Sequence, residues 1–167
     1  MLELTDIAVM EEDVREELEE IKEGSTPGPD GIFTKLIQEL KEELVQPLTI
    51  LFRKSMQEAK IPDKWRDAIM SPIFKKGSKT EPGNYRPVSL TSVFGKTLER
   101  IVKKWLVQHI ETNSLLRDTQ HGFRTVRSAQ TNLIDFLNMT TKWMDERKLF
   151  DVLYLNFQKA FNKFNHD

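Results

Sequence analysis

The residue most telling for chemistry is one polar side chain at the end of an apolar run near the C-terminus. Residues 152–155 are apolar and lead to Asn156, a pattern that predicts a buried strand. A strand that ends in this way can present a carboxylate to Mg²⁺, which prefers anionic oxygen ligands. Asn156 is neutral, and the chain stops ten residues after Phe157. The sequence therefore predicts a catalytic strand that has lost its chemistry.

Two short apolar runs in the centre of the chain predict a pair of strands. They cover residues 68–74 and 85–90, and a polar, glycine-containing connection of residues 75–84 joins them. This order predicts a β-hairpin, although ten residues make a long connection for one.

Basic side chains at this hairpin could bind phosphate groups. Lys75 and Lys76 follow the first run, and Arg86 lies within the second. Lysine is a compact charge, and arginine is a planar fork for phosphate oxygens. The competing interpretation is that these lysines, together with Lys79, only keep an exposed hairpin tip soluble.

Other residue types give weaker signals for chemistry. Three scattered histidines have no metal-ligand spacing: His109, His121 and His166. Aromatic rings could stack on bases, but Trp105 and Trp143 occur at the spacing of a helical core and predict packing instead. For Phe123 both interpretations stay open.

Helical periodicity accounts for most of the remaining chain. Four helical ranges are predicted, over residues 10–23, 32–59, 92–111 and 127–147. Pro47 is expected to start a separate helix within the second range, because proline is tolerated in a first turn. Residues 61–65 predict a turn, and residues 151–157 the terminal strand. The predicted fold class is α+β, helix-rich, with one hairpin.

Composition sets outer limits on the class of protein. The chain has 167 residues, 38% hydrophobic and 31% charged, which fits one domain of ordinary size. No apolar run approaches the roughly 20 residues that span a membrane, so no membrane contact is expected. The absence of cysteine excludes disulfides and thiolate zinc sites, and fits an intracellular protein.

Charge is unevenly placed although the total is only −1. Residues 1–23 contain ten acids and two bases, whereas residues 60–110 contain eleven bases and four acids. A local basic field favours contact with nucleic acid even when the total charge is near zero. The acidic helix predicts a solvated face, with a protein contact as the alternative.

The order of these segments resembles the reverse transcriptase of non-LTR, LINE-type retrotransposons, closest to the chicken-repeat clade. Five collinear runs carry the resemblance: STPGPDGI (25–32), IPDKWRDAIMSPIFKKGSK (61–79), PGNYRPVSLTSVFGKTLERI (82–101), QHGFRTVRSAQTNL (120–133) and DVLYLNFQKAFNKFNHD (151–167). One such match could arise by chance, but five in the same order are specific to the family.

The resemblance implies a truncated reverse-transcriptase domain and its boundaries. Residues 1–24 are then an acidic helical extension, and residues 25–167 a partial domain. Its fingers are expected over about 60–125, and the start of its palm over about 126–167. The thumb and the later Asp-Asp palm motif are absent from this sequence.

The resemblance also implies how the catalytic positions have changed. The family joins nucleotides on an RNA template by two-metal phosphoryl transfer, with Mg²⁺ held by carboxylates. The family's metal-binding Asp falls on Asn156, and the second Asp of that motif falls on Asn162, where a helix cap is the alternative role. An amide brings no negative charge, so we expect no cofactor in this chain and no catalytic residue intact.

Other family roles fall on residues that match. Lys75, Lys76 and Arg86 correspond to the grip on the incoming triphosphate, and Phe161 to the ring that excludes a ribose 2′-OH. A segment near the template contains Gln120, Gly122, Phe123 and Arg124.

Three functions remain open at this point. The first is an inactive reverse-transcriptase fragment that retains affinity for RNA or an RNA–DNA hybrid. The second is a protein-interaction or dominant-negative fragment, which a partner chain completes at the palm. The third is an active enzyme whose remaining motifs lie in a longer chain, and Asn156 argues against it.

Overall fold

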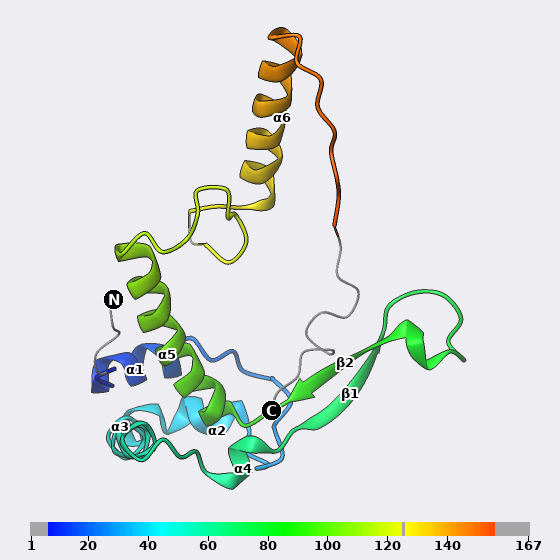
Figure 1. The fold of residues 1–167 in the computed structure, drawn as a ribbon. Helices are drawn as coiled ribbons and strands as arrows, with labels where there is room; N and C mark the ends of the chain where they lie inside the picture. Colours follow the sequence, from blue (N-terminus) through cyan, green and yellow to red (C-terminus); the bar gives the residue numbers. More distant parts are fainter. Residues whose placement is uncertain (1–6, 125, 156–167) are drawn as a thin grey trace. The chain divides into compact units, whose positions relative to one another are not determined.

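The computed structural model describes residues 7–124 and 126–155. These residues form two compact units, one ending at Leu115 and the other beginning at Leu116. Figure 1 shows the elements of both in chain order.

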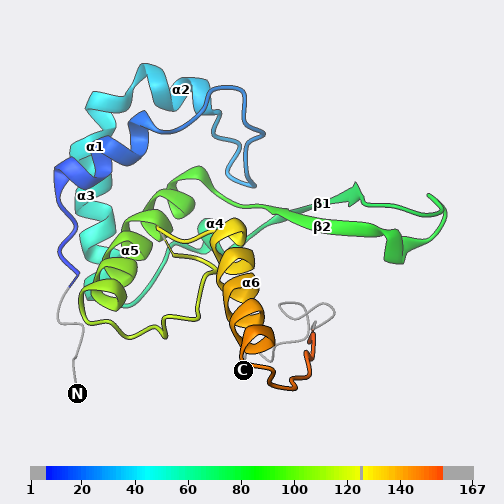
Figure 2. The same cartoon turned by 90° about the horizontal axis from the view of Figure 1, so that it is seen from above.

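The first unit is a body of helices with one long hairpin. Its helices are α1 (Glu11–Glu19), α2 (Thr34–Glu39), α3 (Lys41–Gln57), the short α4 (Asp63–Arg66) and α5 (Val93–Thr112). Helix α1 packs against α3 and α5, as Figure 2 shows from above. Burial of apolar side chains between these helices is the main stabilising term of this unit.

The core of the body consists of apolar residues drawn from every long helix of the unit. Its members are Val9, Val14, Leu18, Ile21, Ile37, Val45, Leu48, Phe52, Val93, Leu98 and Ile101. Spacings of three and four residues within α1 and α3 confirm the periodicity that predicted these helices. Trp105 packs against this core, as its spacing predicted.

The predicted helix bounds were partly wrong. Helix α1 ends at Glu19, short of Gly24, and residues 32–59 form two helices that break at Leu40. Pro47 does not start a helix, because it lies inside α3. It is exposed there, so the carbonyl of Glu43, which loses its helical partner, can bond water instead. The expected turn at 61–65 overlaps the short helix α4, which ends one residue later, at Arg66.

The acidic face of α1 is not wholly solvated, contrary to its simplest interpretation. Glu17 is buried, and its Oε1 lies 2.9 Å from Nζ of Lys104 on α5. Arg100 is the second cation near this carboxylate, with Nη1 3.7 Å from Oε2. The hydrogen bond to Glu17 raises the pKa of Lys104, and burial of the ammonium opposes the shift only in part. This ion pair joins the acidic first helix to the basic α5.

The predicted hairpin is confirmed and projects from the helical body (Figure 1). Strands β1 (Ile69–Phe74) and β2 (Tyr85–Leu90) pair antiparallel, with Ile69 opposite Leu90 and Phe74 opposite Tyr85. The connection contains a 3-10 turn over Pro82–Asn84. Such an ordered turn explains how ten residues can close the hairpin.

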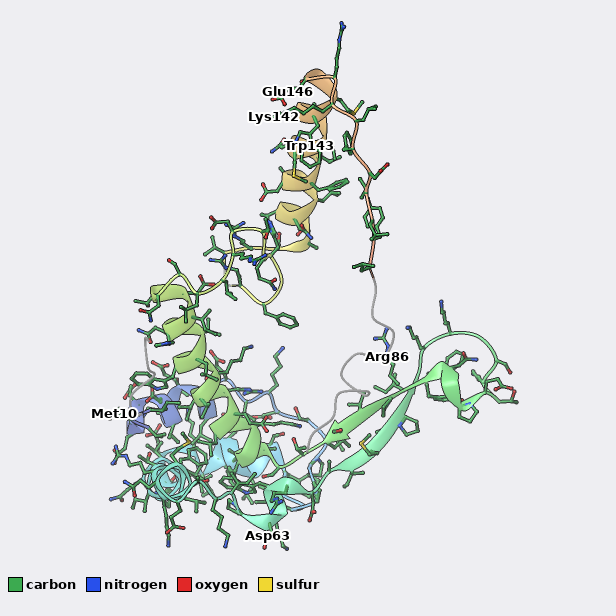
Figure 3. The ribbon with its side chains drawn as sticks, viewed as in Figure 1. Met10, Asp63, Arg86, Lys142, Trp143 and Glu146 are labelled. Atoms are coloured by element: carbon green, nitrogen blue, oxygen red, sulfur yellow. The ribbon has the colours of Figure 1, made fainter. Side chains whose placement is uncertain are left out.

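The second unit contains one long helix, α6 (Ala129–Asp145). Ser128 caps it, since its Oγ accepts from the amide of Thr131 while the Thr131 hydroxyl accepts from the amide of Ser128. The chain then returns beside α6, where the rings of Trp143 and Phe150 lie 5.3 Å apart (Figure 3). None of the large apolar residues described in this unit is buried.

The terminal strand predicted over residues 151–157 is not formed in the described part of that range. Asp151–Leu155 have no strand pairing, and the remaining two residues lie outside the described ranges. A strand needs a neighbouring ladder to satisfy its backbone, and the described residues offer none to this segment. In the two described ranges, no helix is long and apolar enough to cross a membrane.

Candidate nucleic-acid interface

The register of the hairpin decides which side chains share a face. Arg86 is paired with Ile73, and two residues closer to the tip the amide of Lys75 donates to the carbonyl of Asn84 over 2.8 Å. Side chains alternate between faces along a strand. Lys75 therefore lies on the face of Ile73 and Arg86. As diagonal neighbours across an antiparallel pair, Lys75 and Arg86 have β-carbons about 7–8 Å apart.

Aromatic side chains occupy the opposite face of the same end of the hairpin. The rings of Phe74 and Tyr85 meet edge to face with centroids 5.5 Å apart. The ammonium of Lys79 lies 5.9 Å from the centroid of Phe74, within the range of a cation–π contact. Lys79 is thus occupied on the aromatic face, away from Lys75 and Arg86.

The connection is held by its own side chains. The Tyr85 hydroxyl donates to the carbonyl of Lys79 over 2.8 Å, and Nδ2 of Asn84 donates to the carbonyl of Ser78 over 2.9 Å. Gly77 has φ +90, and a β-carbon there would lie 2.6 Å from Nδ2 of Asn84. Only glycine fits this position, because any side chain would clash with Asn84 and would be strained at a positive φ.

The basic side chains of the hairpin are not neutralised by neighbouring acids. Lys75, Lys76 and Arg86 are exposed, and within the described ranges none of them forms an ion pair. Figure 3 shows the Arg86 side chain standing off strand β2. The face that carries Lys75 and Arg86 therefore offers charge and hydrogen-bond donors that can meet phosphate oxygens.

In the second unit, the loop predicted to lie near a template presents an exposed ring. Phe123 has φ +63 and is 92% exposed. A bulky residue in the left-handed region is uncommon and costs free energy. The preceding loop is closed by Gln120, whose Nε2 donates to the carbonyl of Gly122 over 3.1 Å. Arg124 is half-buried, and its Nη1 lies 3.4 Å from the carbonyl of Arg117.

A buried histidine attaches this loop to helix α6. Nδ1 of His121 lies 2.9 Å from the hydroxyl of Thr131, and Nε2 lies 3.2 Å from a carboxylate oxygen of Asp135. Arg127 adds to the network, with Nη2 3.6 Å from Asp118 and Nη1 3.8 Å from Asp135. The network holds the residue two positions before Phe123, so it fixes where the ring emerges.

The sequence did not reveal that His121 and Glu17 are buried and bond side chains of other segments. His121 was only one of three scattered histidines, and its partners lie ten and fourteen residues further on. The signal was the spacing of Thr131 and Asp135, which places both on one face of a helix. For Glu17 no local pattern distinguished it from the other acids of its helix.

Several predicted positions cannot be placed in this structure. Asn156, Phe161 and Asn162 lie outside the described residues. Across residues 7–124 and 126–155, no group of three or more His, Asp or Glu side chains could hold a metal ion.

Comparison with known proteins defines the class. A family model described as "Reverse transcriptase (RNA-dependent DNA polymerase)" matches residues 73–167, more than half of the chain. The match begins in β1 and includes the hairpin tip, β2, α5 and α6. The chain belongs to the reverse transcriptase family.

Curated relatives narrow the kind of reverse transcriptase to that of non-LTR, LINE-type retrotransposons. The chain is 26% identical over 141 residues to a probable RNA-directed DNA polymerase from transposon X-element of Drosophila melanogaster. It is 26% identical over 160 residues to the RNA-directed DNA polymerase from mobile element jockey of the same organism. It is 27% identical over 144 residues to a Pol polyprotein from the type-1 retrotransposable element R2 of Popillia japonica.

These alignments cover 84%, 95% and 85% of this chain but only 16%, 18% and 19% of the relatives. The chain therefore spans less than a fifth of the length of the curated relatives it matches. The resemblance stated from the sequence is confirmed at the level of the family.

Proposed function

We propose that this chain supplies the nucleic-acid and nucleotide grip of a retrotransposon reverse transcriptase. The observation that carries the proposal is the hairpin face on which Lys75 and Arg86 lie as diagonal neighbours without acidic partners. Lys76 adds a third exposed charge at the same end of the hairpin. The hairpin corresponds to the fingers of the family, and its cations would meet the phosphates of an incoming nucleotide or of the strand beside it.

The second unit supports the same proposal through a different chemistry. An exposed aromatic ring can stack on any base when the loop that carries it is fixed by buried contacts. Phe123 satisfies both conditions. Phe161, at the family's position for sugar discrimination, completes the proposed set of contacts together with Gln120, Gly122 and Arg124.

We infer that this chain by itself does not catalyse nucleotide addition. Mg²⁺ in this family needs carboxylates, and the two Asp positions of the first palm motif correspond to Asn156 and Asn162. Neutral amides do not fit the donor set of a two-metal site, because the transition state develops charge that the metals must balance. No catalytic step is assigned to this chain, and Mg²⁺ is not among its proposed ligands.

A specific observation favours a second function, that of a fragment completed by a partner chain. Four consecutive apolar side chains, Val152 to Leu155, are exposed, and their backbone has no strand partner among the described residues. An unpaired apolar segment is a template for strand addition. Sedimentation of the chain, alone and together with an intact relative, tests this function. A chain that stays monomeric in both samples would reject it.

Binding of a labelled RNA–DNA hybrid, followed by fluorescence anisotropy, tests the main proposal. The variant Lys75→Gln/Lys76→Gln/Arg86→Gln removes the hairpin cations. The variant Lys54→Gln/Lys60→Gln/Lys64→Gln removes the same charge from the helical body. We expect binding that the first variant loses and the second largely keeps. Equal affinity of the two variants would reject the hairpin as the grip.

A further inference from the structure

A small cavity on the helical body, separate from the hairpin, is lined by cations and hydroxyl groups. Its volume is about 220 Å³. It lies between the end of α1, the loop that follows, the start of α2 and the first half of α5. Its polar lining consists of Lys22, Ser25, Thr26, Thr34, Lys96, Arg100 and one acid, Glu20. The three cations exceed the single carboxylate, so the lining is positive.

The loop that contributes Ser25 and Thr26 to the cavity continues to Gly28, where two backbones approach closely. A β-carbon on Gly28 would lie 2.5 Å from the carbonyl oxygen of Thr91, directly before α5. Gly28 therefore allows the loop to lie against the start of α5. The amide of Gly31 donates to the Gly28 carbonyl over 3.0 Å and closes the turn. This contact and this turn hold the loop shortly after Ser25 and Thr26 against the start of α5.

The cations of the cavity have unused donor capacity. Within the described part of the chain, neither Lys22 nor Lys96 forms an ion pair, and Lys96 is half-buried. Nη1 of Arg100 lies 3.7 Å from Oε2 of Glu17, a buried oxygen without a hydrogen-bond partner among the described residues, whereas Lys104 contacts the other oxygen, Oε1, at 2.9 Å. The separation from Arg100 is too long for a hydrogen bond, and the guanidinium retains donors for another acceptor.

We propose that this cavity binds a phosphate group, with Lys22, Lys96 and Arg100 as its charged ligands and the Thr26 hydroxyl as a neutral donor. The volume admits a phosphate group. Lys22, Ser25 and Thr26 are exposed and leave the mouth open. A phosphate within a polynucleotide strand can therefore enter without a free end. The site is distinct from the hairpin face and does not rest on the function proposed for it.

Amide resonances of Ser25, Thr26 and Thr34, followed by NMR, report on the cavity in the whole chain. Inorganic phosphate is titrated first, and a single-stranded uridine oligonucleotide second. Saturable shifts at these amides are expected with both probes. Shifts with inorganic phosphate but not with the oligonucleotide identify a site for free anions. Shifts that saturate at a lower concentration of oligonucleotide than of inorganic phosphate identify a site for a strand phosphate. Either result supports the phosphate site.

A pair of matched variants decides the assignment. Lys22→Gln/Lys96→Gln removes two ligands, whereas Lys60→Gln/Lys64→Gln removes two exposed charges outside the cavity. The first variant is expected to weaken phosphate binding about tenfold, as lost hydrogen bonds to a charged group do. The second is expected to leave it unchanged. Absence of saturable shifts in the unmodified chain, or equal weakening in both variants, overturns the proposal.

Discussion

Phe74 and Tyr85 face each other across the hairpin with ring centroids 5.5 Å apart, and this pairing assigns the neighbouring cations to the other face. Because alternation along a strand is strict, a shift of one residue in the register would move Arg86 to the aromatic face. The contact therefore does more than stabilise two strands. It keeps Lys75 and Arg86 together on one surface.

The turn at the hairpin tip is predicted to require glycine at one position and not at another. Gly77→Ala adds a β-carbon 2.6 Å from Nδ2 of Asn84 at a positive φ, whereas Gly83 has no heavy atom within 4 Å of the added carbon. We expect Gly77→Ala to weaken hybrid binding several-fold with little change in melting temperature, because the tip is outside the core.

Gly83→Ala is the control and is expected to bind like the unmodified chain. Anisotropy measures both variants, and circular dichroism confirms that each is folded. If Gly77→Ala binds with full affinity, the geometry of the tip does not matter for binding.

Gly28→Ala is predicted to destabilise the helical body. The added carbon would meet the Thr91 backbone at 2.5 Å, and backbone atoms cannot move aside as a flexible side chain can. Overpacking of this kind costs about 1–3 kcal/mol. Urea unfolding measures the loss, with Gly83→Ala as the reference, and equal stability of the two variants would contradict the close approach.

The ion pair between α1 and α5 is predicted to contribute to stability in a pH-dependent way. Lys104→Met leaves the buried Glu17 with only the more distant Arg100. We expect a loss of about 1 kcal/mol, because the Lys104 side chain is partly exposed and the pair is screened by water. Lys103→Met, on the same helix and without an acidic partner in the described ranges, is the matched control.

The sign of the pH effect follows from the raised pKa of Lys104. The stabilisation is fully present below the ordinary lysine value of 10.5 and is lost as pH rises through the higher value of the folded chain. Urea unfolding at neutral and strongly alkaline pH should show the difference between Lys104→Met and the unmodified chain shrinking only above 10.5. A difference that persists unchanged would assign the loss to packing.

Much of the fold could be predicted from local patterns in the sequence. The hairpin followed from two apolar runs and a turn-rich connection, and α5 and α6 from strong periodicity that the structure reproduces within two residues at each end. Pro47 was misplaced because solvent, rather than the helix, can satisfy the Glu43 carbonyl, and no local rule reports exposure.

The features that could not be predicted from the sequence depend on contacts between segments that are distant along the chain. The pairing of Glu17 with Lys104 and of His121 with Asp135 depends on how helices and loops pack. The close approach of Gly28 to Thr91 joins two backbones that are 63 residues apart along the chain. The basic hairpin residues were identifiable by type, but their common face required the register.

Phe123 is predicted to contribute to binding of single-stranded RNA without contributing to stability. Its side chain is 92% exposed, so Phe123→Ala removes almost no packing. Loss of a stacking ring typically costs about 1–3 kcal/mol of binding. Val126→Ala, which alters a side chain 91% exposed in the same unit, is the control. Anisotropy with a uridine oligonucleotide measures both, and identical affinities would reject a stacking role.

The salt dependence of hybrid binding tests the proposed grip most directly. Each phosphate contact that a cation makes contributes about 0.9 to the slope of log K against log salt concentration for a duplex. Lys75→Gln/Lys76→Gln/Arg86→Gln is predicted to reduce the magnitude of this negative slope by about 2–3. Lys54→Gln/Lys60→Gln/Lys64→Gln is predicted to change it little. An unchanged slope in the hairpin variant would contradict the claim that this hairpin holds nucleic acid through its cations.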